Sequence, residues 1–377
     1  MPWIRHIVTG VLARAGVESS RLRGGGSKVH VIARGMRQHL RTIIAVVAAA
    51  GLLALFLRNT DFRQVGAEIS RARVDLLLLA LVVTGLTYCF RAARWQYLLR
   101  PVGHVHFVPA LKTTIIGFAA SSLLPARAGE LLRPYLLARK EGLSATATFA
   151  TIIVERLLDT VTVLLLFAGY LLFAEPGMSS SQAQTFAQVK LGGAVMAGAC
   201  LVVLVVLFVL AGHPRVLAQV ANVVTRLLPG RLAASATKVV HAFSEGLAIV
   251  RQPVRLLLAL VFSLPLWLSI ATGIWAVTHA FHMDLPFSGA FLIQALLVVG
   301  VAVPTPGAVG GFHYFYKLGM TAFYGAPADR AVGAAIVLHA VSFVPVAIVG
   351  LILLAQEGMS LSRVGSLTRG GEAEEPA

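Results

Sequence analysis

The sequence predicts an all-α polytopic membrane protein with about six full transmembrane helices and two re-entrant broken hairpins. Three observations support this fold class. Of the 377 residues, 57% are hydrophobic and only 13% are charged, whereas a soluble domain carries about 25% charged residues. Several apolar stretches reach the ~20 residues that a membrane-spanning helix needs. Two further apolar regions are interrupted by proline and glycine.

The six expected spans can be placed in order along the chain. They lie near residues 41–58, 75–98, 151–174, 189–211, 256–280 and 331–355. We expect them to form one transmembrane domain over residues 41–356. A basic cytoplasmic tail at 1–40 precedes this domain, and a C-terminal tail at 357–377, expected to be disordered, follows it.

The two broken regions cover residues 107–140 and 288–324. The first contains the break Leu124-Pro-Ala-Arg-Ala-Gly-Glu130, and the second contains Val303-Pro-Thr-Pro-Gly-Ala-Val-Gly-Gly311. Broken backbone at membrane depth is tolerated only where it is buried in protein or lines a cavity. Paired, interrupted segments of this kind are the best sequence pointer to the binding site of a transporter.

Loop charges predict the orientation of the chain. The loops 175–188 and 281–287 contain no Lys or Arg, whereas 212–255 contains six. Positive loops face the cytoplasm, so the first two should be outside and the third inside. Counting spans then makes 107–140 a hairpin that enters from the cytoplasm and 288–324 a hairpin that enters from outside, with both termini inside.

The loop 59–74 is less consistent with this orientation. The span count places it outside, although it carries three arginines that are only partly offset by Asp61 and Glu68. Orientation rules count Lys and Arg rather than net charge. The predicted topology therefore rests on the other loops.

A faint internal repeat supports the same scheme. The pattern Pro-x-x-x-Gly occurs at 125–129 and again at 306–310, and the stretch that starts at Gly142 is similar to the one that starts at Gly325. Each unit would contain a span, a hairpin and a span, with opposite sidedness. The sequence therefore predicts an inverted-topology repeat.

The first cluster of candidate site residues follows the first break and consists of Arg127, Glu130 and Arg133. Glu130 and Arg133 are three residues apart, so on a helix they share a face. A helix that starts after Pro125 would direct unpaired N–H groups at an anion. We expect a phosphate site here, and the alternative is a cytoplasmic loop whose arginines only follow the positive-inside rule.

The second cluster lies inside the third span and consists of Glu155, Arg156 and Asp159. Glu155 and Asp159 are one helical turn apart and share a face. Ionisable groups in a membrane segment are costly and need partners, water or a substrate headgroup. The alternatives left open are a substrate site and a structural ion-pair network, and these two roles are compatible.

Two further groups remain ambiguous. Arg91, Arg94 and Trp95 lie at the inner end of the second span, where they either snorkel to the interface or contact a lipid headgroup. The glycines between Pro304 and His313 permit a backbone that lines a cavity. His313 by itself is more typical of a buried core histidine than of a ligand.

The sequence contains no signature of an enzyme. It has neither a zinc-type His-Glu-x-x-His nor a Gly-x-Ser-x-Gly elbow, so we expect no catalytic residues, no metal and no cofactor. The net charge of +16 fits cytoplasmic loops and anionic lipid headgroups. No basic region is interleaved with aromatic residues, which argues against nucleic-acid binding.

Four motifs together resemble a known family. They are Arg-x-x-Arg-Trp-x-x-Leu-Leu at 91–99, Leu-Leu-Pro-x-Arg-x-Gly-Glu-x-x-Arg at 123–133, Thr-Ile-Ile-Val-Glu-Arg-Leu-Leu-Asp at 151–159 and Pro-Thr-Pro-Gly-Ala-Val-Gly-Gly at 304–311. In this order and spacing, they resemble the lysylphosphatidylglycerol synthase transmembrane region family of flippase-like membrane proteins. The resemblance covers about residues 40–356.

The resemblance implies movement of a phospholipid, glycolipid or hopanoid between leaflets of a bacterial-type inner membrane. The substrate-binding residues that it implies are Arg94, Arg127, Glu130, Arg133, Glu155, Arg156, Asp159, Pro306, Gly307 and Gly310. One departure is Gly311-Phe312-His313, where members often carry an Arg-Glu pair. The chain also lacks a soluble aminoacyl-transferase domain, so we expect that it does not make lysyl-phosphatidylglycerol itself.

Two other functions stay open. The first is a membrane-embedded glycosyl- or acyltransferase that uses a polyprenyl-phosphate or lipid donor, although such enzymes usually have acidic residues in a sizeable outer loop. The second is an accessory subunit of a lipid-synthesis enzyme. The partners considered besides the lipid are therefore a second copy of the chain and a neighbouring lipid-synthesis enzyme.

Overall fold

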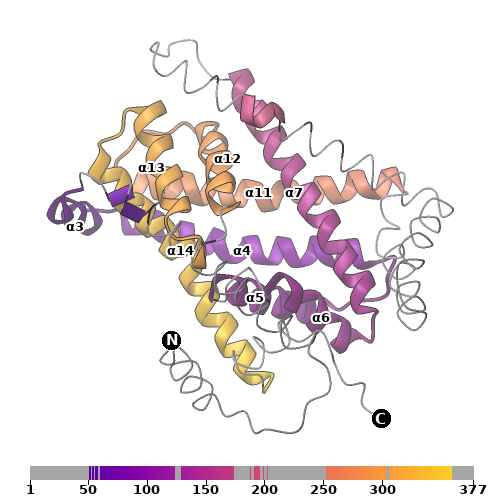
Figure 1. Ribbon diagram of the computed structural model, residues 1–377. Coiled ribbons are helices and arrows are strands. Elements are labelled where there is room, and N and C mark those ends of the chain that lie inside the picture. Colours follow the sequence, from indigo (N-terminus) through magenta and orange to yellow (C-terminus); the bar gives the residue numbers. More distant parts are fainter. Residues whose placement is uncertain are drawn as a thin grey trace, which may run out of the picture. The chain divides into compact units, whose positions relative to one another are not determined.

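The structure is a computed structural model that describes residues 60–123, 129–173, 252–302 and 305–358, with some residues between 51 and 57 and between 187 and 202. Every regular element in this part of the chain is a helix (Figure 1), which confirms the all-α prediction. The long helices are α4 (Val74–Leu99), α7 (Ala145–Phe173), α11 (Pro253–Ala280) and α14 (Ala328–Gln356). The shorter ones are α3 (Phe62–Ser70), α5 (Phe107–Leu123), α6 (Gly129–Glu141), α12 (Gly289–Ala302), the 3-10 turn η3 (Pro306–Ala308) and α13 (Gly311–Tyr324).

Three of these helices, α4, α11 and α14, are long and apolar enough to cross a membrane. They correspond to the predicted spans 75–98, 256–280 and 331–355. The helix α7 begins at Ala145, earlier than the predicted start at residue 151. The Ala147 amide donates to Ser144 Oγ over 3.3 Å, and this N-terminal cap explains the early start because it satisfies a free amide of the first turn.

Several predicted segments lie outside the described residues. The tail 1–40 is outside them completely, and the spans 41–58 and 189–211 are described only at scattered positions. The C-terminal tail is described only at Glu357 and Gly358. The structure therefore does not test the predictions for these segments.

The outer surfaces of the long helices are apolar. On α4, Leu78, Val82 and Leu86 are 57%, 60% and 45% exposed, and on α14, Ile348 and Ile352 are each 53% exposed. Soluble monomers rarely expose contiguous apolar surface on this scale. These side chains fit contact with lipid tails, and the chain is a multi-pass membrane protein.

Each broken region forms a pair of short helices, as predicted from its proline–glycine break. In the first pair, α5 packs against α6 where Gly117 meets Gly129, and a Cβ on Gly129 would collide with the Gly117 carbonyl oxygen. In the second pair, α12 packs against α13 where Gly300 meets Gly311, with the same kind of collision. The glycines are therefore required by close backbone approach.

Two glycines mark corresponding turns between a short helix and the long helix that follows it. Gly142 separates α6 from α7 with φ +67°, and Gly325 separates α13 from α14 with φ +60°. A left-handed residue is a common way to end a helix, and glycine adopts it without strain. This shared requirement explains why the stretches that start at these two glycines are similar in sequence.

The described helices form two sets with the same order. Each set contains a long helix, two short helices and a long helix: α4, α5, α6, α7 and then α11, α12, α13, α14. The two first helices, α4 and α11, pack extensively against each other. The last helix of each set packs against the first short helix of the other set, so that α14 contacts α5 and α7 contacts α12.

The helices α4 and α11 run antiparallel. The Arg73 amide, just before α4, donates to the Ala280 carbonyl at the end of α11 over 2.9 Å. In the middle, the Thr87 and Ser269 hydroxyls are hydrogen-bonded over 2.6 Å. The C-terminal ends of α4 and α11 therefore lie at opposite ends of this helix pair. One short-helix pair follows each of these ends along the chain.

One described helix was not predicted. The segment 59–74, expected to be a loop, contains α3, whose first amides at Arg63 and Gln64 donate to the carboxylate of Asp61 over 2.9 and 3.4 Å. Aspartate is a favoured N-terminal cap. An ion pair of 3.1 Å between Glu68 and Arg330 ties α3 to α14, so the helix is stabilised by tertiary contacts that the sequence does not reveal.

Candidate polar cavity between the two helix sets

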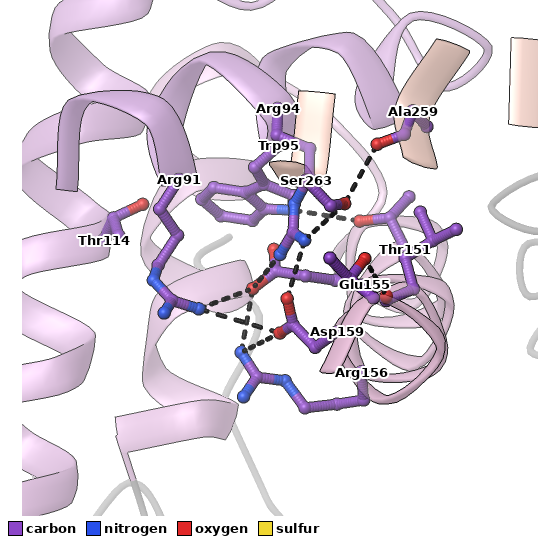
Figure 2. A network of polar contacts seen from close by, with 12 residues as sticks. Arg91, Arg94, Trp95, Thr114, Thr151, Glu155, Arg156, Asp159, Ala259 and Ser263 are labelled. Atoms are coloured by element: carbon purple, nitrogen blue, oxygen red, sulfur yellow. Dashed lines mark hydrogen bonds and ion pairs between the residues drawn. The ribbon is translucent and has the colours of Figure 1, made fainter. Parts of the chain in front are cut away.

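The centre of the candidate site is the facing surface of α4 and α7. On α4, Arg91 and Arg94 are one turn apart, and on α7, Glu155 and Asp159 are one turn apart. Both pairs therefore share a helix face. Their side chains converge between the helices (Figure 2).

Glu155 is the hub of the resulting network. Its side chain is fully buried, and its Oε1 atom lies 2.8 Å from Arg156 Nη2 and 2.9 Å from Arg133 Nη1. Guanidinium nitrogens of Arg94 and Arg91 lie 3.6 and 3.8 Å from the same oxygen. One carboxylate thus joins α4, α6 and α7.

Asp159 extends the network to α11. It accepts hydrogen bonds from Arg94 Nη1 over 2.6 Å and from Trp267 Nε1 over 2.9 Å. Arg91 and Arg156 each lie 3.7 Å from its other oxygen. Hydrogen bonds to a carboxylate are stronger when the donor is charged, so Arg94 is its strongest partner.

The aromatic residues around the network hold the arginines in place. The Arg133 guanidinium lies 3.8 Å from the centre of the Trp95 ring, and that of Arg91 lies 4.6 Å from the Phe118 ring. Trp95 itself is fully buried and donates from Nε1 to Thr151 Oγ1 over 3.0 Å. Cation–π contacts of this kind are strengthened by exclusion of water.

The snorkelling interpretation of Arg94 and Trp95 is wrong. Both side chains have no exposed surface, and Arg94 also donates to Ser263 Oγ over 2.9 Å. They point toward α7 and α11 and not toward an interface. The reason is that Glu155 and Asp159 on α7 offer Arg94 charged partners inside the protein. A side chain with such partners does not have to reach the membrane interface.

The network leaves hydrogen-bonding capacity unused. Within the described part of the chain, Arg133 Nε and Nη2, Arg91 Nε and Arg156 Nε are buried without a hydrogen-bond partner. Glu155 Oε2 and Asp159 Oδ2 are in the same condition. Buried polar groups are normally hydrogen-bonded, so the unpaired atoms of residues that line the cavity are available to a ligand or to water.

A cavity of about 420 Å³ lies directly beside the network. Its lining comes from the α-helices α4, α5, α6, α7, α11, α12, α13 and α14, together with the second break. The charged lining residues are Arg91, Glu130, Arg133, Arg156 and Asp159. The volume is within the usual range for small-molecule sites, ~300–1,000 Å³.

The predicted site residues fall into four groups. Glu130, Arg133, Arg156, Asp159 and Gly307 line the cavity. Arg94 and Glu155 are fully buried behind it and do not belong to its lining. Pro306 and Gly310 shape the second break, and Arg127 lies outside the described residues.

Glu130 and Arg133, which were expected to share a helix face, lie on the same side of α6. Both residues line the cavity, but Arg133 reaches across to Glu155 on α7. An ion pair between two helices fixes α6 against α7, which a pair within α6 would not do. The two clusters identified in the sequence are thereby brought together around one cavity.

The second break contributes backbone groups rather than charge. Gly307 has φ +60° and Gly310 has φ +89°, conformations that side chains other than glycine rarely adopt. His339 Nε2 on α14 donates to the Gly307 carbonyl over 2.7 Å. The ring of His313 lies 4.6 Å from that of His339, and Phe312 lines the cavity.

Several lining residues were missed by the sequence reasoning. Arg91 was noticed but not included among the predicted site residues, although its charge inside a span was a sufficient signal. Gln294 is an isolated amide in the otherwise apolar α12 and could have been found in the same way. Trp267 and Ser269 on α11 gave no signal, because their role depends on how α11 packs against α4.

The described residues offer no site for a metal ion, since no group of three His, Cys, Asp or Glu side chains converges among them. The cavity is lined by guanidinium groups, the carboxylates of Glu130 and Asp159, hydroxyls and one amide.

Comparisons with known proteins agree with this architecture. Residues 42–350 match the family model described as lysylphosphatidylglycerol synthase TM region. A UPF0104 membrane protein of Methanocaldococcus jannaschii is 23% identical over 122 residues, which cover 32% of this chain and 36% of that protein. The aligned part is thus about a third of the relative. The family match spans most of the chain, including both helix sets, and the chain belongs to the lysylphosphatidylglycerol synthase TM region family.

Proposed function

We propose that the protein moves a lipid with an anionic or amphipathic headgroup between bilayer leaflets, with the headgroup passing through the polar cavity. The observation that carries this proposal is the set of unpaired guanidinium N–H groups on Arg91, Arg133 and Arg156, all of which line the cavity. A phosphate offers these donors the acceptors that they lack. Intramembrane charge of this kind is typical of substrate pathways.

The charge of the network favours an anion. Four arginines of the network share the two carboxylates Glu155 and Asp159, and Glu130 supplies a third carboxylate at the cavity wall. An excess of positive charge in a low-dielectric site is costly unless a counter-charge binds. A lipid phosphate would supply it.

The arrangement of the helices supports alternating access. The Thr87 and Ser269 hydroxyls touch each other along the antiparallel pair α4 and α11, as expected near a two-fold axis between these helices. We infer an inverted-topology repeat, with α5–α6 and α12–α13 as re-entrant hairpins from opposite faces and the N-terminus in the cytoplasm. Transporters with such repeats bind substrate where the repeats meet.

A lipid tail also has a path. An apolar groove between α4 and α14 is lined by Val74, Leu77, Leu78, Leu81, Ala340, Val341, Val344 and Pro345. Val341 belongs to the lining of both this groove and the polar cavity. We propose that the tail stays in this groove, in contact with the bilayer, while the headgroup occupies the cavity.

The proposal includes no chemical step. Among the described residues, the arginines at the cavity share the carboxylates Glu155 and Asp159 in one network, an arrangement that suits anion binding. Transport would therefore occur without covalent change to the lipid. A transferase or accessory role remains the alternative if transport fails the following test.

The test is leaflet exchange of labelled phosphatidylglycerol in vesicles that contain the purified full chain. Arg133→Ala should reduce the rate about 10- to 100-fold, since hydrogen bonds to charged groups contribute ~1.5–3 kcal/mol. Arg133→Lys keeps the charge but loses the forked geometry, so its exchange rate should lie between those of Arg133→Ala and the unchanged protein. Arg139→Ala, on an exposed position of the same helix, is the control and should have no effect.

Two results would contradict the proposal. One is folded Arg133 variants that exchange lipid at the unchanged rate, which would favour the accessory role. The other is exchange by the unchanged protein that does not exceed that of empty vesicles. Thermal unfolding of each variant separates loss of folding from loss of transport.

The sidedness of the hairpins can be tested separately by cysteine labelling after replacement of Cys89 and Cys200. Arg139→Cys, at the end of α6, should react with an impermeant reagent from the cytoplasmic side, and Ala328→Cys, at the start of α14, from the outside. Both positions are exposed. Labelling of both from the same side would contradict the inverted repeat.

A further inference from the structure

A neutral polar group faces the cavity and is not used by the arginine network. Gln294 on α12 lines the cavity and is 1% exposed, and neither its amide nitrogen nor its amide oxygen has a hydrogen-bond partner among the described residues. Thr305, in the second break, is 8% exposed and lines the same cavity, and its hydroxyl is also unpaired there. The two residues come from segments that do not contribute to the ion pairs.

An unpaired buried amide is unfavourable and calls for a partner. Gln294 is the only polar residue between Gly289 and Ala302 in α12, so its burial is not a by-product of a polar helix. Its amide presents donors and an acceptor together. A hydroxyl group complements both, because it donates one hydrogen bond and accepts others.

The charges around the cavity restrict the ligand further. Among the described residues of the network and the lining, four arginines stand against the three carboxylates Glu130, Glu155 and Asp159, an excess of one positive charge. A phosphodiester carries one negative charge and balances it. A headgroup with additional ammonium groups would add buried positive charge, which is costly.

We propose that the substrate is a phosphodiester lipid whose headgroup is neutral and bears hydroxyl groups, such as glycerol or inositol. The arginines bind the phosphate, and Gln294 and Thr305 bind the headgroup hydroxyls. The cavity thereby selects against lipids with a cationic aminoacyl headgroup. This inference rests on the proposed transport function and names the substrate class for the same site.

The experiment uses three lipid probes in vesicles that contain the full chain. Phosphatidylglycerol carries the phosphate and the hydroxyls, phosphatidylmethanol carries the same charge without hydroxyls, and lysyl-phosphatidylglycerol adds positive charge. We expect phosphatidylglycerol to exchange about fivefold faster than phosphatidylmethanol, the ratio that corresponds to one net hydrogen bond. Phosphatidylinositol should behave like phosphatidylglycerol, and lysyl-phosphatidylglycerol should be the slowest.

Two variants assign this selectivity to Gln294. Gln294→Leu should remove the difference in exchange rate between phosphatidylglycerol and phosphatidylmethanol. Gln294→Glu should remove the charge preference for phosphatidylglycerol over lysyl-phosphatidylglycerol, because the added carboxylate cancels the excess of one positive charge. Gln64→Leu, on an exposed position of α3, is the matched control and should preserve all ratios.

The outcomes separate the inference from the proposed function. If phosphatidylglycerol and phosphatidylmethanol exchange equally fast, or if Gln294→Leu folds and leaves their ratio unchanged, transport stands and the hydroxyl subsite is refuted. Faster exchange of lysyl-phosphatidylglycerol than of phosphatidylglycerol by the unchanged protein would likewise refute the charge argument. If no probe exchanges faster than in empty vesicles, both the proposed function and this inference are refuted.

Discussion

Removing the charge of Glu155 should test whether the buried network holds the helices together. Glu155→Gln keeps the shape of the side chain but replaces a carboxylate that lies within 2.8 to 3.8 Å of four guanidinium groups. The four arginines would then share only Asp159 within the network. We expect a loss of stability because positive charge is left buried without a counter-charge.

The magnitude follows from the contacts. Breaking a buried ion pair costs ~3–5 kcal/mol when one charge is left unpaired. Arg133, one of the two closest partners, keeps its position over the Trp95 ring at 3.8 Å, a contact that contributes ~0.5–2 kcal/mol. We therefore expect a loss near the lower end of the range, about 3 kcal/mol.

The assay is reversible denaturation of the purified protein in detergent or nanodiscs, followed by tryptophan fluorescence. A double-mutant cycle with Arg94→Gln sharpens the result, because this second change restores the charge balance at a residue that does not line the cavity. The double variant should be more stable than the sum of the single effects predicts, by about 0.5–3 kcal/mol. Asp75→Asn, which breaks an exposed pair with Arg73, is the control.

A Glu155→Gln variant with unchanged stability would refute this reasoning. So would additive effects in the double-mutant cycle, because additivity would mean that Glu155 and Arg94 are not coupled. In either case the network would be a substrate site whose charges are already solvated by water in the cavity.

The remaining predictions concern the helix crossings and the second break. Gly129→Ala and Gly311→Ala should each destabilise the protein by about 1–3 kcal/mol, because the added methyl group collides with backbone of the partner helix. Gly85→Ala is the control, since a Cβ there would have open space. It should be neutral or stabilising in the same denaturation assay. His339→Ala should leave the Gly307 carbonyl without its 2.7 Å hydrogen bond and speed amide exchange in the break. His339→Gln keeps a hydrogen-bond donor, so amide exchange in the break should increase less than in His339→Ala. Equal rates of amide exchange in both variants and the unchanged protein would contradict the role of His339.

The fold was predictable to the extent that it follows from apolar length and backbone chemistry. The helices α4, α11 and α14 were anticipated because uninterrupted apolar stretches of this length have few alternatives to a spanning helix. Both short-helix pairs were anticipated because proline and glycine interrupt helices at defined positions. The helix α3 was not, because its stability depends on Asp61 as a cap and on an ion pair with Arg330, far away in the sequence.

The site was predictable in composition but not in geometry. Charged residues in apolar segments identified Arg133, Glu155 and Asp159 correctly as members of one polar centre. Their partners could not be read from helix spacing, because the closest contacts of Glu155 and Asp159 include residues of other helices. For the same reason, the sequence could not separate Arg94, which is buried behind the cavity, from Arg156, which lines it.

The two helix sets share an architecture but divide the chemistry of the cavity unequally. At the sequence separation that relates Gly117 to Gly300, Arg156 on α7 corresponds to His339 on α14, and Asp159 corresponds to Ser342. The first set thus carries the charge, whereas His339 in the second set binds a backbone carbonyl of the break. A site in which one wall attracts an anion and the opposite wall offers neutral hydrogen-bonding groups favours one orientation of a polar headgroup. On the proposed function, this asymmetry, more than the overall excess of arginine, would favour a lipid with a phosphate at one end of its headgroup and hydroxyls at the other.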